Sequence, residues 1–89
     1  MLIFYIYIMR VEIDKYIVID SEICHGKPTF KGTRVLVSDV IELIASGVPV
    51  EEILRDYYPS LTKEMIQDAL RLAANIIRGE HHVKYPIPA

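Results

Sequence analysis

The sequence contains one cysteine, no tryptophan, four glycines and five prolines among its 89 residues. A single cysteine cannot form an intramolecular disulfide, which excludes the small secreted scaffolds that disulfides hold together. The low glycine and proline content excludes a linker and a collagen-like chain. The sequence also lacks internal repeats and low-complexity tracts. A chain of this length and pattern is expected to form a single domain.

The chain also lacks a strong net charge. Ten Lys and Arg residues against twelve Asp and Glu give a net charge of −2, which excludes a strongly basic nucleic-acid-binding protein but not a local basic patch. Residues 23–38 contain three cations and no acid, whereas residues 39–59 have a net charge of −4. This segregation is also compatible with ordinary surface charge. With 52% hydrophobic residues, the chain is globular, and we expect it to bury its excess apolar surface by forming oligomers.

The longest apolar run is Leu2–Met9, which is far shorter than the roughly 20 residues that span a bilayer. It is a poor signal peptide because no cation precedes it and charged residues follow it. We therefore expect a cytoplasmic protein without a membrane segment. The run is typical of a β-strand, and its apolar faces predict dimerisation through Ile3, Tyr5 and Tyr7. Alternatively, Met9 is the natural start and the preceding residues are an extension.

Strands are predicted in the first third of the chain. Lys15–Asp20 is a short β-branched run, which indicates a strand, and Asp20–Pro28 contains glycine and proline, which indicates a loop. Thr29–Val37 is expected to be extended with a break at Gly32. It ends either in a strand or directly in a helix.

The hydrophobic period then becomes helical. Ser38 is a plausible N-cap for a helix over residues 38–46, which Gly47 would end. A second helix is predicted to start at Pro49 and to end before Pro59. We expect that, of the two tyrosines before Pro59, one joins the core and the other lies at the surface.

The longest predicted helix covers residues 62–78, with Thr62 as its N-cap and Gly79 just after its end. Its apolar stripe consists of Met65, Ile66, Ala69, Leu70, Ala73, Ile76 and Ile77. The fold class is therefore mostly α with short N-terminal strands. Residues 1–14 form an N-terminal strand or extension, residues 15–79 the domain, and residues 80–89 an extended arm.

A short helix, a tight link and a longer helix form the outline of a helix-turn-helix. The first turns of the last helix would then contact DNA bases and phosphates. The candidate DNA-binding residues there are Thr62, Lys63, Gln67 and Arg71. The alternative is a plain three-helix bundle that binds no DNA, a reading that the acidic second helix favours.

A more specific pattern runs from residue 17 to residue 79. It comprises Gly26-Lys27-Pro28, then Gly32-Thr33-Arg34, and then Tyr58-Pro59-Ser60-Leu61-Thr62 before an alanine-rich helix. In this order the chain resembles the domain-of-unknown-function 433 family.

The resemblance implies a three-helix homeodomain-like domain that is related to winged-helix proteins. It also implies an antitoxin of VapB type, encoded beside a PIN-like ribonuclease toxin. One departure from the family pattern is Val48-Pro49-Val50, which supplies no hydroxyl to cap the second helix. The missing cap costs about 1 kcal/mol.

The same glycines allow a second interpretation of the basic segment. Gly26 and Gly32 permit positive φ angles, and Pro28 stiffens the chain between them. The resulting arm could contact a phosphate or an acidic partner through Lys27, Lys31 and Arg34. Alternatively, Arg34 braces the domain by pairing with an acid of the first helix or with a helix C-terminal carbonyl.

Residues with chemical potential do not assemble into an active site in the sequence. Cys24-His25 lacks a third group that would orient a nucleophile and its base. His81-His82 lacks the spacing of metal ligands. Glu51-Glu52 fits the start of a helix, where the dipole favours anions. We therefore expect no catalytic residue, no metal and no cofactor, and a protein that is not an enzyme.

Two functions remain. The first is an antitoxin that binds operator DNA as a homodimer and neutralises a PIN-like ribonuclease toxin. The arm after Gly79 would contact the toxin through His82, Val83, Tyr85 and Ile87. The alternative is a non-enzymatic protein-interaction module, or a stand-alone transcriptional regulator of the same fold, with no toxin partner.

Overall fold

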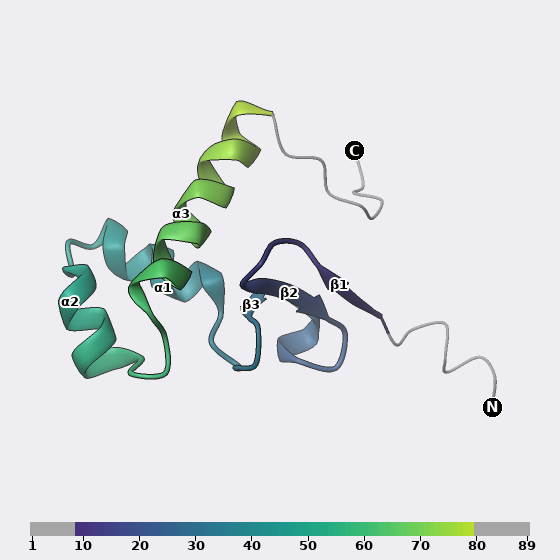
Figure 1. Cartoon of the computed structure of the whole chain (residues 1–89), viewed down its shortest axis with the longest axis horizontal. Helices are drawn as coiled ribbons and strands as arrows, with labels where there is room; N and C mark the ends of the chain where they lie inside the picture. Colours follow the sequence, from purple (N-terminus) through teal and green to yellow (C-terminus); the bar gives the residue numbers. More distant parts are fainter. Residues whose placement is uncertain (1–8, 80–89) are drawn as a thin grey trace.

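The computed structural model describes residues 9–79, which form a small sheet at one end and helices at the other, with α1 between the sheet and α2 (Figure 1). The strands are β1 (Arg10–Glu12), β2 (Ile17–Asp20) and β3 (Thr29–Phe30), and the helices are α1 (Val37–Ala45), α2 (Val50–Glu52) and α3 (Lys63–Arg78). The predicted combination of three helices with short N-terminal strands is confirmed for these residues, and about half of them are helical. The predicted dimer residues Ile3, Tyr5 and Tyr7 lie outside the described residues.

The sheet is antiparallel, with the order β1-β2-β3. Within the predicted run Lys15–Asp20, the strand begins at Ile17, which lies opposite Phe30 on β3. On the other side, Val11 of β1 lies opposite Ile19. The pairing continues to Met9, whose carbonyl accepts a hydrogen bond from the Ser21 backbone N–H at 2.8 Å. The central position of β2 explains why its apolar residues are buried.

The segment after β3 turns once and then enters α1 directly. Gly32 takes a φ of +81°, which a residue with a Cβ rarely adopts. Past this turn, Leu36 forms an isolated bridge to Thr29. The predicted break at Gly32 is confirmed, and the extended segment ends in a helix and not in a further strand.

Ser38 is not the N-cap of α1, so that prediction is wrong. The N-cap is Leu36, and it provides no side-chain cap. Its carbonyl accepts from the backbone N–H of Asp39 at 3.2 Å, and the Val37 N–H donates to the Pro28 carbonyl at 3.1 Å. Backbone carbonyls thus satisfy the N–H groups of Val37 and Asp39 at the start of the helix, without a capping hydroxyl.

The second helix begins and ends where the sequence predicts, but it changes from α-helical to π-helical within its length. Pro49 is the N-cap of α2, one residue before the helix begins. From Ile53 to Tyr57 the chain is π-helical, and the Tyr58 N–H donates to the carbonyl of Ile53 at 2.8 Å. Tyr58 packs against the core while Tyr57 is exposed. The expected division between the two tyrosines is confirmed.

Local chemistry defines both ends of α3. The Thr62 hydroxyl accepts from the Met65 N–H at 3.2 Å, and Gly79 closes the helix in the left-handed conformation. Both predicted ends are therefore confirmed. The predicted apolar stripe is only partly buried, since Ile76 is 51% and Ile77 85% exposed, and the prediction also missed the buried Leu72. The stripe is exposed at its end because the last turns of α3 project beyond the body of the domain (Figure 1).

A single core joins the sheet to all the helices. Its fully buried aliphatic and aromatic side chains come from β2, β3, α1, the π-helical turn and α3: Ile17, Phe30, Val40, Ile53 and Ile66. Thr29 is equally buried, and its hydroxyl oxygen has no hydrogen-bond partner among the described residues. A buried polar atom without a partner costs about 1–3 kcal/mol.

We predict that Thr29→Val stabilises the domain by about 1 kcal/mol, because it removes this buried hydroxyl and conserves the shape of the side chain. The melting temperature should rise by roughly 4–8 °C, which thermal unfolding followed by circular dichroism would measure. Thr33→Val is the matched control. The Thr33 hydroxyl donates to the Phe30 carbonyl at 2.7 Å and accepts from the Val35 N–H at 3.0 Å, so the same exchange should destabilise the domain. A drop in melting temperature for Thr29→Val would contradict the prediction.

Candidate functional site

One face of α3 carries the polar residues that the sequence singled out. Lys63, Gln67 and Arg71 are all exposed and recur every four residues, which places them along one side of the helix. The side chains of Lys63 and Gln67 make no hydrogen bond or ion pair with any other residue of 9–79. Thr62 is exposed beside them, although its hydroxyl also caps the helix.

Arg71 is held only loosely by its own helix. Its guanidinium lies 4.0 Å from a carboxylate oxygen of Asp68, and its side chain is 68% exposed. Exposed pairs of this kind contribute at most about 1 kcal/mol. Arg71 therefore remains able to contact another molecule.

Asp68 lies at the seam between α3 and the turn that joins β1 to β2. Its side chain is only 14% exposed, and its Oδ2 atom is buried without a hydrogen-bond partner among the described residues. Burial raises the pKa of this carboxyl, and the nearby Asp14 raises it further, whereas Arg71 and the Tyr16 backbone N–H lower it. Protonation of Asp68 would remove the repulsion between the two carboxylates, since a protonated Asp68 could donate a hydrogen bond to Asp14.

We predict that Asp68→Asn raises the melting temperature at pH 7. A carboxyl whose pKa is raised on folding destabilises the folded state above that pKa, and the penalty disappears as the pH falls towards the ordinary value. The gain should therefore shrink on acidification, which melting curves between pH 7 and pH 3 would show. Glu42→Gln, at an exposed site on α1, removes the same charge and serves as the control. A gain that stays constant with pH, or that the control reproduces, would refute the assignment.

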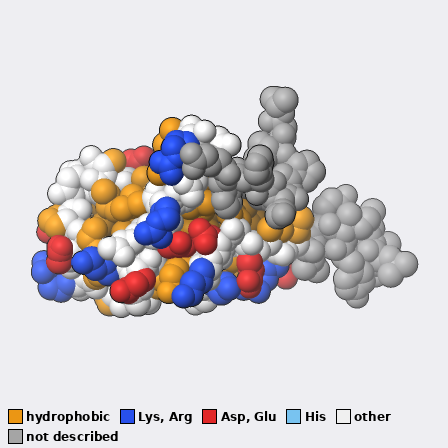
Figure 2. All heavy atoms as spheres, turned by 45° about the horizontal axis from the view of Figure 1, so that its top comes forward, with side chains coloured by type: hydrophobic (Ala, Val, Ile, Leu, Met, Phe, Trp, Pro, Cys, Tyr) orange, Lys and Arg blue, Asp and Glu red, His pale blue; other side chains and the backbone are white. Residues whose placement is uncertain are grey.

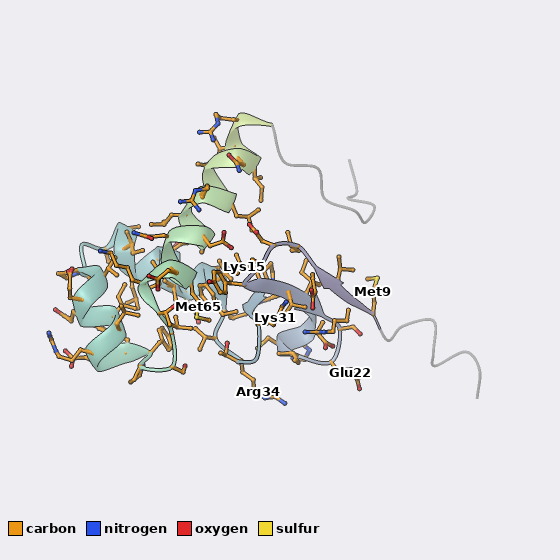
Figure 3. The ribbon with its side chains drawn as sticks, in the orientation of Figure 1. Met9, Lys15, Glu22, Lys31, Arg34 and Met65 are labelled. Atoms are coloured by element: carbon orange, nitrogen blue, oxygen red, sulfur yellow. The ribbon has the colours of Figure 1, made fainter. Side chains whose placement is uncertain are left out.

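The three cations of the basic segment differ in whether they are ion-paired. The Lys31 ammonium lies 3.1 Å from Glu12 of β1. The side chains of Lys27 and Arg34 are exposed and form no ion pair or hydrogen bond with any other described residue. Arg34 points away from the body of the domain (Figure 3), so the alternative in which it braces the domain against an acid or a carbonyl is wrong.

The turn before β3 has an unusual backbone. Cys24, His25 and Gly26 take successive φ angles of 50°, 58° and 79°, and the left-handed region costs a residue with a Cβ about 1–2 kcal/mol. The Cys24 Sγ donates to the Arg34 carbonyl at 3.4 Å, which ties this turn to the loop before α1. His25 is not among the partners of the thiol, so the turn forms no nucleophile–base pair.

Metal ligands do not gather within residues 9–79, where no three His, Cys, Asp or Glu side chains form a cluster that could hold an ion. His81 and His82 lie outside the described residues, as do the other predicted partner-binding positions, Val83, Tyr85 and Ile87.

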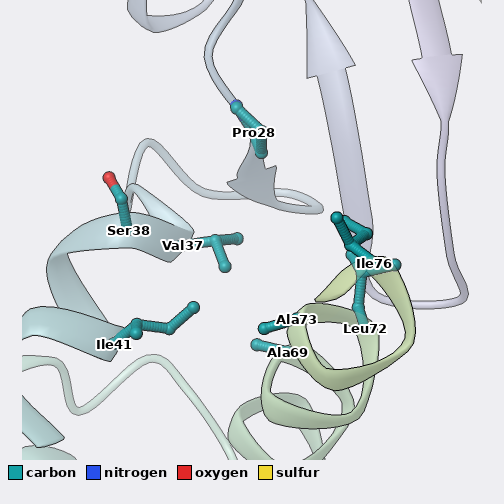
Figure 4. Close-up of a pocket in the computed structure, with 8 residues that line it drawn as sticks. All are labelled: Pro28, Val37, Ser38, Ile41, Ala69, Leu72, Ala73 and Ile76. Carbon is teal, nitrogen blue, oxygen red and sulfur yellow. The ribbon is translucent and has the colours of Figure 1, made fainter. Parts of the chain in front are cut away.

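On the side of α3 that faces away from Lys63, Gln67 and Arg71, an apolar groove of about 210 Å³ lies between this helix and α1. Figure 4 shows the side chains that line it: Pro28, Val37, Ser38, Ile41, Ala69, Leu72, Ala73 and Ile76. The small Ala69 and Ala73 leave the space that larger side chains would fill. This groove was not predicted from the sequence. The only feature of the sequence that indicates it is the alanine-rich second half of the last helix.

Charge is mixed on the face of the molecule that Figure 2 shows. Cationic and anionic side chains alternate there, with apolar side chains between them (Figure 2). An extended surface of one sign is thus not present on that face. A contact with a polyanion would therefore depend on a few cations and not on the field of a broad basic surface.

Sequence comparisons place this geometry in a known family. The profile described as "Protein of unknown function (DUF433)" matches residues 17–73, a stretch that includes β2, the left-handed turn and most of α3. The chain belongs to the DUF433 family. The resemblance derived from its glycine, proline and tyrosine pattern is thereby confirmed.

A curated relative is similar over most of this chain. It is "Uncharacterized protein y4eO" from Sinorhizobium fredii (strain NBRC 101917 / NGR234), which is 41% identical over 68 residues. The match covers 75% of this chain but only 30% of that protein. No solved structure matches the chain. Between residues 9 and 79, none of the helices has the length and hydropathy needed to cross a bilayer.

Proposed function

We propose that this DUF433 protein is an antitoxin that binds operator DNA through α3 and neutralises a PIN-like ribonuclease toxin. The observation that carries the DNA-binding part is the exposed row of Lys63, Gln67 and Arg71 at the start of a capped helix. The toxin part rests on the resemblance of the family pattern to VapB-type antitoxins.

The arrangement of the last helices supports a helix-turn-helix of homeodomain-like type. The residues from Val50 to Tyr57 form a short helical segment, and Tyr58–Thr62 link it to the longer α3. In such motifs the second helix enters the major groove, and its N-terminal residues contact base edges. Gln67 would then read an adenine, while Lys63 and Arg71 would contact guanine or phosphate.

Two exposed cations outside α3 could add phosphate contacts. Lys27 follows the left-handed turn and Arg34 precedes α1, and neither side chain pairs with another described residue. Lys31 contributes less, because Glu12 already neutralises it. We infer that Lys27 and Arg34 position the domain on the DNA backbone, whereas α3 supplies the base contacts.

We further propose that the chain acts by binding and not by catalysis, and that it does so in the cytoplasm, where operator DNA and the toxin are found. Binding as a homodimer would match the two-fold symmetry of operators. The apolar positions Ile3, Tyr5 and Tyr7 would then join two copies through their N-terminal segments.

We predict that Lys63→Ala and Arg71→Ala each weaken binding to the DNA upstream of the gene. Each lost phosphate contact should also lower the slope of log affinity against log salt by about 1. Fluorescence anisotropy of labelled upstream DNA across a salt series would measure both quantities.

The matched control is Arg55→Ala. Arg55 is equally exposed but is paired with Asp56 at 2.9 Å and lies on the other helix of the proposed motif. Its loss should leave affinity and slope unchanged. If Lys63→Ala and Arg71→Ala bound as tightly as the unmodified chain, with the same salt slope, α3 would not be the DNA-reading helix.

A second candidate is a protein-interaction module with little DNA affinity of its own. It is favoured by the exposure of Ile76 and Ile77 at the end of α3, because large aliphatic side chains exposed together indicate a contact surface. For this function, Ile77→Glu should abolish the recovery of a nuclease-like partner by tagged chain from nuclease-treated host lysate. Under the DNA-reading function alone, the same variant should bind upstream DNA normally and no such partner should be recovered.

A further inference from the structure

The groove between α1 and α3 has no occupant among residues 9–79. Its walls are aliphatic apart from Ser38. Ile76, at the end of the groove nearest the C-terminus of α3, is half exposed. Water in such a groove has almost no polar partner, so covering it with apolar side chains would be favourable.

We propose that the chain's own C-terminal arm occupies this groove, with Val83, Tyr85 and Ile87 against α3 and α1. This inference rests on the groove and on the sequence of the arm, and it does not depend on the proposed function. It concerns the free protein, before any DNA or toxin is bound.

The place where the described chain ends supports this occupant. Gly79 adopts a φ of +76°, and its N–H donates to the Ile76 carbonyl at 3.0 Å. A left-handed residue at this position ends the helix and turns the chain away from the helix axis. The arm therefore starts one helical turn from Ile76, which lines the groove.

The length of the arm fits the length of the groove. From Ile76 to Ala69 the groove follows α3 for about 10 Å. Glu80–His82 can span up to about 10 Å when extended, which is enough to bring Val83 back to the level of Ile76. The remaining residues then suffice to follow the groove to Ala69.

The composition of the arm fits an extended ligand with one apolar side. Val83, Tyr85 and Ile87 alternate with Lys84, Pro86 and Pro88. Prolines keep the chain and the residues before them extended, and alternate side chains of an extended chain share one face. Lys84 would then point to solvent while its neighbours enter the groove.

Covalent attachment favours this arm over other apolar segments. A ligand on a short flexible tether has an effective concentration on the order of millimolar. A segment of a second copy or of a partner would have to be present at a comparable concentration to displace it. The arm would also shield the exposed Ile76 and Ile77, which lie next to its point of attachment.

The test is paramagnetic relaxation in the full-length chain. A spin label is attached through Lys84→Cys in a Cys24→Ser background, which removes the single native cysteine and keeps a donor for the Arg34 carbonyl. Methyl signals of Ile41, Ala69 and Ala73 should broaden strongly. Leu54, which does not line the groove, should be unaffected. Absence of broadening at the groove methyls would overturn the proposal.

Two further samples separate the occupants. Isotope-enriched chain without a label is mixed with unenriched labelled chain, and the groove methyls should then stay sharp. Broadening only in this mixture would assign the groove to a second copy and overturn the proposal.

The second sample tests the apolar side chains of the arm. In the labelled chain, Val83→Asp with Ile87→Asp should abolish the broadening, whereas the control pair His81→Asp with Ala89→Asp should preserve it. Broadening that survives the first pair, or that both pairs abolish, would show that apolar insertion does not hold the arm.

Discussion

Ile17 on β2 and Phe30 on β3 lie opposite each other in the sheet, and both are completely buried in the core that the helices share. A domain of this size buries only about 60% of its unfolded surface, so it has few such contacts to lose. These residues connect the sheet to Val40 of α1, Ile53 of the π-helical turn and Ile66 of α3. The orientation of α3, and with it the polar row and the groove, depends on the packing of this pair.

The contact between the β1–β2 turn and α3 contains an unfavourable pair of carboxylates. Because the β1–β2 turn packs near α3, Asp14 and Asp68 face each other, and burial keeps water from screening them. Arg71 compensates only weakly from the exposed side at 4.0 Å. A polar group retained at a cost in stability is a frequent property of functional surfaces, where stability and activity compete.

The parts of the fold that depend on local chemistry could be predicted from the sequence. Thr62 caps α3 and Gly79 ends it because a hydroxyl and a residue without a Cβ suit those positions whatever surrounds them. Contacts between distant segments could not be predicted in this way. Ser38 is not the cap because the helix already begins at Val37, whose N–H donates to the Pro28 carbonyl of the preceding segment.

Of the candidate site, the sequence predicted the polar row on α3 but not the groove on the opposite side of that helix. The row follows from helical spacing alone, which Lys63, Gln67 and Arg71 show directly. The groove requires α1 and α3 to approach each other at Ile41 and Ala73, and the sequence does not contain that information. The pairing of Lys31 with Glu12, which separates it from Lys27 and Arg34, depends in the same way on strand register.

The projecting end of α3 has one more consequence. From Thr62 to Leu72 the helix is capped and has buried side chains, but the turns that follow expose both isoleucines. A short helical stretch without tertiary support is barely stable in water, so the helix should be progressively easier to open towards Gly79. Its last turns would then exchange their amide hydrogens first, and any molecule that covers them would lengthen the stable part of the helix. Ligand binding at this end would be linked to helix formation, and its heat-capacity change would report the ordered turns as well as the buried surface.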